Sequence, residues 1–396
     1  MNEESNFPPG FLWGTATAAH QIEGNNSNND WWHWEKSKKD IPDSGVACNH
    51  YDLYKEDFKL AKEILHNNAH RLSLEWARIE PREGVYDEKE MLHYKKVLGE
   101  LRRLGLKTMV TLHHFTNPLW FAQKSGWEKK ENLKYFKRYV SFCAREFNDL
   151  VDYWIVINEP NVYLTMSYLR GFWPPEKKNL LLALRVFLNL ASAHKRAYRI
   201  IHQTIPAAQV ASSINMAYFK PSLLVETVAN YSFILLSPRS WDFIGINYYF
   251  LHQFDLNKIP LIRKIKRKDF LKLIGGEKTD LGWPIYPQGI YEVVKKNWKK
   301  FKIPIIITEN GIADKGDSKR PRFILDHLTW LNQAIKEGVD VRGYFYWTLM
   351  DNIEWGLGKK ARFGLFETDY KTLKRIPRKS AFLYGKICQD NAIFST

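Results

Sequence analysis

The stretch DYWIVINEP, residues 152–160, is a run of aromatic and β-branched residues that ends in Asn158 and Glu159. Residues 303–311, IPIIITENG, repeat this construction, because an apolar run again leads into a glutamate, Glu309. Near-continuous apolar runs of this length are typical of parallel strands that are covered on both faces. Each run therefore predicts a buried strand with a glutamate at its carboxyl end.

Further β-rich runs lie on both sides of these two, at residues 11–18, 69–76, 106–114, 208–216, 241–249 and 341–350. Segments with helical apolar spacing and charged faces lie between most of the runs, for example at 51–65, 93–105, 132–147 and 321–338. Eight alternating strand and helix units predict an α/β fold, a (β/α)8 or TIM barrel, rather than an open sheet. Since no linker-like segment divides the chain, residues 1–396 are expected to form a single domain.

A barrel of this kind carries its active site at the carboxyl ends of the strands. Polar and aromatic residues stand at or just past the predicted strand ends: Gln21, Arg71, His114, Asn158, Glu159, Asn247, Tyr249, Glu309, Trp347, Glu354 and Trp355. Two carboxyl groups with aromatic platforms suit the cleavage of glycosidic bonds, because one protonates the leaving oxygen while the other stabilises or attacks an oxocarbenium-like centre. The sequence therefore predicts a pocket for a small-molecule glycoside.

Five motifs support this interpretation: HQIEG at 20–24, RLSLEWARIEP at 71–81, INEP at 157–160, ITENG at 307–311 and YWTLMDNIEWGLGKKARFGL at 346–365. Together they resemble glycoside hydrolase family one, the β-glucosidase family, in the right order over nearly the whole chain. The resemblance implies a retaining, exo-acting β-glycosidase that hydrolyses terminal non-phosphorylated β-D-glucosides, and also β-galactosides and β-fucosides, through a covalent glycosyl-enzyme. It implies no cofactor and no metal.

The resemblance also implies roles for individual residues. Glu159 matches the general acid/base and Glu309 the nucleophile, with Tyr249 donating a hydrogen bond to Glu309 and Arg71 holding it ionised. Asn158 is expected at the sugar 2-hydroxyl. The residues that match substrate-binding positions are Gln21, His114, Trp347, Glu354, Trp355 and Phe363. A 6-phosphate is expected to be disfavoured, because the Glu354 carboxylate would repel it.

The sequence departs from the family pattern at a few places. Phe115 stands where a tryptophan commonly follows the sugar-binding histidine, and Asn117 stands where leucine is usual. We therefore expect a different pocket wall. The segment between Met216 and Trp241 is shorter than in most members, which predicts a more open side for the leaving group.

Several residues have structural interpretations that we prefer. Glu23 and Glu75 are expected to pair with Arg71, Arg78 or His20. Adjacent histidines at 113 and 114 point to opposite faces of a strand, so one is expected to bind sugar and the other to pack, without a metal. The stretch DWWHWEKS at 30–37 is interpreted as a loop whose tryptophans pack.

The formal net charge of +16 permits anionic partners, but no nucleic-acid-binding motif is present. The basic run LIRKIKRKDFLK at 261–272 motivates a second hypothesis, weak contact with anionic membranes. Rival functions are transglycosylation at the same site, or a non-catalytic barrel that binds sugar or membrane. The expected partner remains a β-glycoside or short β-linked oligosaccharide, and the sequence does not indicate an oligomeric state.

Three widely spaced cysteines predict small buried core residues and a reducing compartment. The first residues, MNEESNFPPG, lack the basic and apolar regions of an export signal. The sequence therefore predicts a cytoplasmic location.

Overall fold

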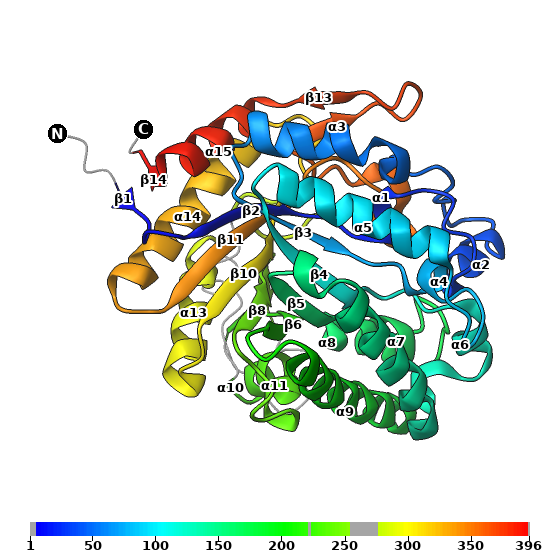
Figure 1. Cartoon of the computed structure of the whole chain (residues 1–396). Helices are drawn as coiled ribbons and strands as arrows, with labels where there is room; N and C mark the ends of the chain where they lie inside the picture. Colours follow the sequence, from blue (N-terminus) through cyan, green and yellow to red (C-terminus); the bar gives the residue numbers. More distant parts are fainter. Residues whose placement is uncertain (1–4, 221–222, 254–275, 395–396) are drawn as a thin grey trace.

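The structure is a computed structural model that describes residues 5–220, 223–253 and 276–394 (Figure 1). The basic run at 261–272 lies outside the described residues, so its suggested contact with membranes stays a prediction. Among the helices of the described residues, none combines the length and the apolar character that crossing a bilayer requires.

Eight strands close into a barrel in the order β10-β11-β2-β3-β4-β5-β6-β8, and every neighbouring pair is parallel. The strands are β2 (Leu12–Ala16), β3 (Ala69–Ser73), β4 (Lys107–His113), β5 (Tyr153–Asn158), β6 (Gln209–Asn215), β8 (Ile244–Asn247), β10 (Ile305–Asn310) and β11 (Val341–Trp347). Each lies within one of the eight predicted runs. The predicted (β/α)8 barrel is therefore confirmed.

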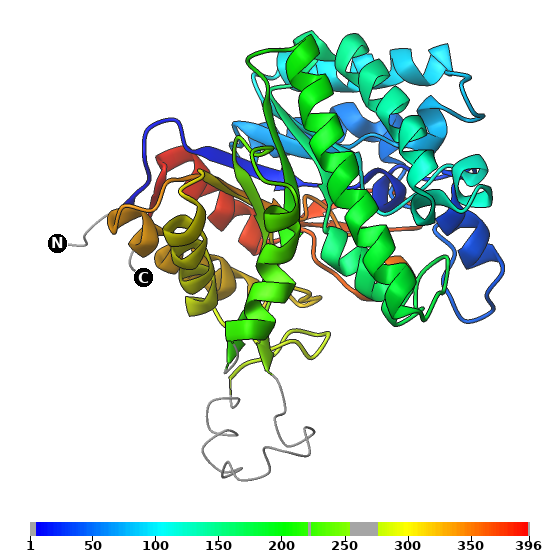
Figure 2. The same cartoon turned by 90° about the horizontal axis from the view of Figure 1, so that it is seen from below.

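Helices cover the outside of the barrel in both views (Figures 1 and 2). The long ones are α3 (His50–Glu63), α5 (Glu88–Arg103), α7 (Leu133–Glu146), α9 (Leu180–Thr204), α13 (Gln288–Phe301), α14 (Arg320–Lys336) and α15 (Lys379–Asp390). The short ones are α1 (Ala19–Ile22), α2 (Asp30–Lys36), α4 (Trp76–Ile79), α6 (Leu119–Gln123), α8 (Pro160–Leu164), α10 (Leu223–Glu226) and α11 (Ser232–Leu236). The four helices predicted by apolar spacing correspond to α3, α5, α7 and α14.

Short strand pairs lie outside the barrel. They are β1 (Ser5–Asn6) with β14 (Ala392–Ile393), β12 (Phe366–Thr368) with β13 (Arg375–Pro377), and β7 (Tyr218–Lys220) with β9 (Leu251–Gln253). The first pair joins the two ends of the described chain next to α14 and α15 (Figure 1). This pairing closes the amino-terminal end of the barrel, away from the strand ends that carry the predicted site.

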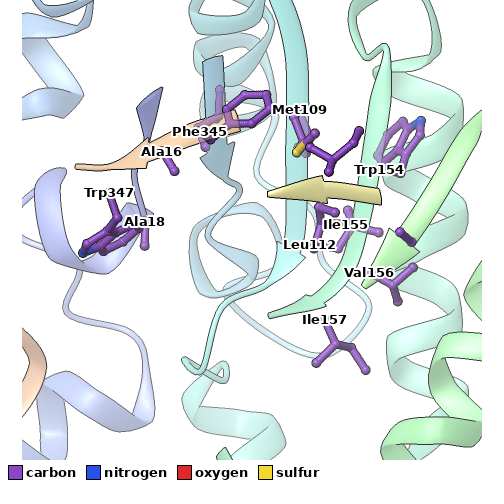
Figure 3. Packing of buried hydrophobic residues seen from close by; sticks show 14 of the residues in the cluster. Ala16, Ala18, Met109, Leu112, Trp154, Ile155, Val156, Ile157, Phe345 and Trp347 are labelled. Atoms are coloured by element: carbon purple, nitrogen blue, oxygen red, sulfur yellow. The ribbon is translucent and has the colours of Figure 1, made fainter. Parts of the chain in front are cut away.

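Side chains fill the barrel interior, so it is a packed core. Met109, Ile155 and Phe345 come from three different strands and belong to one hydrophobic cluster (Figure 3). The Phe345 ring lies over Gly14, where an added Cβ would stand 2.5 Å from the ring. Gly14 thus leaves the space that this ring needs. The hydrophobic cluster lies below the predicted site and supports the charged residues there.

Candidate active site

The two glutamates of the sequence motifs lie at neighbouring parts of one barrel end. Glu159 follows β5 directly and has a left-handed φ of 44°, which turns the chain from the strand into α8. Pro160 occupies the first turn of that helix, where its missing N–H is not needed. Such a φ is uncommon for a residue other than glycine and persists only where surrounding contacts enforce it. Here the turn aims the Glu159 carboxyl into the pocket.

Glu309 lies near the end of β10, and Gly311 follows two residues later at a point where the chain is tightly packed. An added Cβ on Gly311 would stand 1.8 Å from the backbone oxygen of Trp347. Only glycine therefore fits where the end of β10 passes the end of β11. The glycine of ITENG is explained by this close approach, which lets the ends of β10 and β11 meet.

Glu309 is held by two donors. Arg71 Nη1 lies 2.5 Å from Oε1, and the Tyr249 hydroxyl donates to Oε2 at 2.6 Å. Both oxygens of the carboxylate are thus fixed in place. This arrangement favours the ionised form relative to a carboxyl group of equal burial without these partners.

The Arg71 guanidinium is fully buried, and three of its four other hydrogens also find acceptors. Nη2 donates to Asn158 Oδ1 at 2.6 Å, Nη1 to the Thr308 carbonyl at 3.1 Å, and Nε to Thr111 Oγ1 at 3.3 Å. Arg71 therefore links β3, β4, β5 and β10. It orients Asn158 as well as Glu309.

Glu159 has a different environment, because its donors are neutral amides. Asn215 Nδ2 and Asn247 Nδ2 both donate to Oε1 at 2.9 Å. Burial, followed by the nearby charge of Glu309, raises the pKa of Glu159 to about 8. With Oε1 accepting both amide hydrogen bonds, Oε2 is left to carry the proton.

Burial also raises the pKa of Glu309 above its ordinary value, although Arg71 and Tyr249 oppose this rise. Desolvation by burial has the largest effect, and Arg71 and Tyr249 act on Glu309 in the direction predicted for them. The asymmetry between the two carboxyl groups remains. The cation and the phenol hydrogen bond to Glu309, whereas only amides hydrogen bond to Glu159.

Aromatic rings form one wall of the pocket. The His114 ring stacks between Trp347 and Trp355, with ring centroids 6.0 Å apart in both cases. His114 Nε2 also lies 3.1 Å from Asn158 Nδ2, so one nitrogen is engaged while Nδ1 has no partner among the described residues. Trp355 is backed by Trp31 at 4.6 Å between centroids.

Gln21 and Glu354 lie at the same end of the pocket. Gln21 Nε2 donates to the Ile353 carbonyl at 2.8 Å and approaches Glu354 Oε2 at 3.3 Å. Gln21 Oε1 and Asn352 Nδ2 are buried without a partner in the described part of the chain. Buried polar atoms are normally satisfied, so these atoms together with His114 Nδ1 suit a hydroxyl-rich ligand.

Burial and the charges of Glu309 and Glu159 raise the pKa of Glu354 to about 8. Burial therefore favours the protonated form of Glu354 relative to an exposed carboxyl group. The sequence argument, which set a charged Glu354 against a phosphate, is corrected on this point. The charges that act on Glu354 in the described part of the chain come from Glu309 and Glu159, which are both acids.

Phe363 lies at the other edge of the pocket. Its ring centroid is 6.2 Å from that of Tyr249 and 6.1 Å from that of Trp283. The structure thus brings together Gln21, Arg71, His114, Asn158, Glu159, Tyr249, Glu309, Trp347, Glu354, Trp355 and Phe363 at one end of the barrel.

The two departures from the family pattern have different consequences. Phe115 does shape the wall, since its ring contacts Trp355 at 5.1 Å and Trp173 at 5.0 Å. Asn117 instead hydrogen bonds to both oxygens of Asp30, through its backbone N–H and its side-chain amide, each at 2.8 Å. Asn117 therefore belongs to the support behind the wall.

Other structural interpretations are mostly confirmed. His113 lies behind the pocket against Trp127, while its neighbour His114 lies in it. Glu23 pairs with Arg78 at 2.9 Å, as expected. Glu75 does not pair with an arginine, because Asn26 and Thr116 donate to it, and burial raises its pKa.

The stretch at 30–37 differs from its predicted form. It is helix α2, whose first turn is capped by Asn29, where a loop was expected. Its Trp31 and Trp34 are buried, so the predicted packing role is confirmed. Asn29 could have predicted this helix, because an asparagine just before such a segment favours the start of a helix.

Asn215 is the residue that the sequence analysis missed. It ends β6, and the strand-end rule that selected the other residues applies to it equally. The three cysteines are buried free thiols. In the portion that the structure describes, no three His, Cys, Asp or Glu side chains gather in a way that could hold a metal ion.

A (β/α)8 barrel with two buried glutamates at the strand ends, differently hydrogen bonded, is the arrangement of a glycoside hydrolase. The family model of glycosyl hydrolase family 1 matches residues 3–229 and 224–393, and the chain belongs to this family. It is 31% identical to β-glucosidase A from Thermotoga maritima, over 98% of each chain.

Solved structures agree with this assignment. A β-glycosidase from Pyrococcus horikoshii superposes with a TM-score of 0.88 at 38% identity, over 99% of this chain and 96% of that one. The β-glucosidase from Thermotoga maritima in complex with glucoimidazole gives 0.90 at 29% identity, over 98% of this chain and 100% of that one. The predicted family and enzyme class are confirmed.

Proposed function

We propose that the chain hydrolyses terminal, non-phosphorylated β-D-glucosides, with Glu309 as nucleophile and Glu159 as acid and base. Glu309 attacks the anomeric carbon while Glu159 protonates the departing oxygen, which gives a covalent glycosyl-enzyme. Glu159, now ionised, then takes a proton from water, and the water oxygen displaces Glu309 with net retention.

The observation that carries this assignment is the contrast between the two carboxyl groups. Glu309 accepts hydrogen bonds from a guanidinium and a phenol on its two oxygens, as an anionic nucleophile requires. Glu159 accepts two amide hydrogen bonds on one oxygen only, and its pKa of about 8 keeps a proton available at neutral pH. Pairs of carboxyl groups with such different environments divide into nucleophile and acid.

The substrate preference rests on the wall opposite the acid. Gln21, His114 and Glu354 would hydrogen bond the hydroxyls of one sugar ring, and Trp347 and Trp355 would offer flat apolar surfaces; their gathering at one end of the barrel supports this. Asn158 is placed for the 2-hydroxyl. Because a carboxyl and an amide can serve either epimer at C4, β-galactosides and β-fucosides are included. The single sugar so enclosed makes the enzyme exo-acting on β-glycosides or short β-linked oligosaccharides.

The test is the release of 4-nitrophenol from its β-D-glucoside by the wild type and by Glu309→Gln. Turnover that falls by several orders of magnitude in the variant supports the nucleophile assignment. Adding azide to Glu309→Gly is expected to yield the α-glycosyl azide, because azide replaces the missing carboxylate on its own face of the sugar.

Glu159→Gly with azide is the matched control and is expected to give the β-glycosyl azide. The same azide stereochemistry from both variants would refute the assignment of roles. Product analysis of the wild type with added alcohol separates hydrolysis from transglycosylation. No turnover by a folded wild type on glucoside or galactoside would favour a non-catalytic barrel.

Residues 1–396 are proposed to act as one domain, since β1 and β14 join the two ends of the described chain beside a single barrel. The cytoplasm is the proposed location, because three unpaired thiols are compatible with a reducing compartment.

A further inference from the structure

The amino-terminal half of α9 exposes aliphatic side chains where a surface helix normally carries polar ones. Leu180, Leu181, Leu184 and Leu188 have exposed fractions of 64%, 77%, 50% and 54%. They follow the spacing of one helix face, while Ala183, Val186, Phe187 and Leu190 fill the opposite, buried face. This half of α9 is therefore apolar on its outward stripe as well as on its packed face, with Arg185 beside the stripe.

The exposed stripe ends within the same helix. Continuing the four-residue spacing beyond Leu188 leads to Ser192 and Arg196, and the outward face becomes polar again. The apolar patch is thus a local feature. Phe172, 54% exposed, lies in the segment just before the helix. The five side chains, Phe172 with the four leucines, are called the α9 patch.

The α9 patch lies toward the pocket end of the barrel. Helices in this fold run antiparallel to the preceding strand, so the start of α9 is on the side where β5 ends in Glu159. Trp173, next to Phe172, reaches the pocket wall, with its ring centroid 5.8 Å from that of Trp355. The patch and the pocket wall are therefore joined by one short segment.

Cations flank the α9 patch. Exposed Arg170, Lys177, Lys178 and Arg185 all fall between residues 169 and 188, where the sequence has one acid, Glu176. That acid is paired with Lys38 at 2.7 Å. The guanidinium of Arg170 lies 5.4 Å from the Phe172 ring centroid. The surface is thus aliphatic at its centre and positive at its margin.

We propose that the α9 patch docks the enzyme on lipid bilayers that carry anionic headgroups. Leucines entering the boundary between headgroups and acyl chains, with Lys and Arg among the phosphates, satisfy both parts of this surface. A second copy of the chain fits less well, because a two-fold contact through the patch would bring the flanking cations of both copies together. Docking places the pocket end near the membrane.

The test is co-sedimentation of the full chain with vesicles of phosphatidylcholine alone or mixed with phosphatidylglycerol. The wild type is expected to pellet with the anionic vesicles at low ionic strength, and less at raised ionic strength because the cations are screened. The triple variant Leu180→Ser, Leu181→Ser, Leu184→Ser is expected to lose at least about tenfold in partitioning.

The matched control replaces three exposed side chains elsewhere, Leu92→Ser, Ile376→Ser and Phe382→Ser. They lie on α5, β13 and α15, across the barrel from α9 (Figure 1). The control is expected to pellet like the wild type. Both triple variants are expected to hydrolyse the soluble 4-nitrophenyl glucoside at the wild-type rate, which shows that they are folded.

Three outcomes would overturn the proposal. The first is that the wild type does not pellet with anionic vesicles. The second is that pelleting survives in the α9 triple variant but is lost when the basic residues of 261–272 are neutralised. The third is that, by sedimentation velocity without vesicles, the wild type is a dimer and the α9 variant a monomer, in which case a second copy covers the patch.

Discussion

Asn247 and Glu159 share a 2.9 Å hydrogen bond that couples the two halves of the active site. The side-chain oxygen Oδ1 of Asn247 accepts from the Thr308 hydroxyl at 2.6 Å, and Thr308 directly precedes Glu309. Glu159 after β5 and Glu309 on β10, the proposed acid and nucleophile, are therefore both connected to one side-chain amide on β8. A shift of either glutamate relative to the other would break one of these hydrogen bonds.

The pH profile of kcat/KM should be bell-shaped. Glu159 must be protonated in the free enzyme, so activity is expected to fall as the pH rises through about 8, the pKa of that group. Glu309 must be ionised, which sets the acid limb. The measurement is kcat/KM for 4-nitrophenyl β-D-glucoside across pH, with Glu159→Gln on a substrate whose leaving group needs no proton as control. A control that keeps the alkaline limb would contradict the assignment.

Replacing Asn215 by alanine should move the alkaline limb to higher pH. The amide donates to Glu159 and lowers its pKa, so its loss raises that pKa, by roughly half a unit for one neutral hydrogen bond. In the Glu309→Gly background, Asn215→Ala should leave the rate of azide rescue little changed. An alkaline limb that moves down, or an unchanged one, would mean that Asn215 does not act on the acid.

Glu159→Gln should stabilise the fold above neutral pH. The folded pKa of about 8 exceeds the unfolded value of about 4.5, so folding retains a proton that the unfolded chain releases. Stability is therefore lost as pH rises between these values, and the variant is expected to recover about 2–4 kcal/mol at pH 8. Chemical denaturation at pH 4 and pH 8 measures the difference.

The control for that experiment is Glu309→Gln. This change leaves the buried Arg71 guanidinium without its carboxylate, so no comparable gain is expected. Equal stabilisation by both variants would show that burial, and not the partner of each carboxyl group, decides the effect.

Asn117→Leu should destabilise the fold while leaving KM for the glucoside nearly unchanged. The variant leaves Asp30, whose pKa burial raises to about 7, without its side-chain donor. The expected loss is about 1–3 kcal/mol in the free energy of unfolding at pH 8, where Asp30 is ionised. Combining it with Asp30→Asn should give less than the additive effect. A large rise in KM with unchanged stability would instead place Asn117 in the pocket wall.

The sequence predicted the barrel because each strand is a short apolar run that is buried on both faces. Such runs can be recognised in the sequence without knowledge of tertiary contacts. It also located both glutamates, since parallel strands of a closed barrel all end at one rim. Asn29 also indicated the start of α2, but the tryptophans of this segment were interpreted as a packed loop instead. Asn215 was readable by the same rim rule that found Glu159.

Other properties depended on neighbours that the sequence does not place. Which donor meets which oxygen of Glu159 and Glu309, and hence which carboxyl carries the proton, follows from amides on β6 and β8, the phenol of Tyr249 and a guanidinium on β3. The raised pKa of Glu354 follows from burial beside two other acids. The exposure of the α9 patch follows from the side of α9 that packs on the barrel. Local pattern thus determined the fold and the rim, whereas burial and distance between residues remote in sequence decided the chemistry.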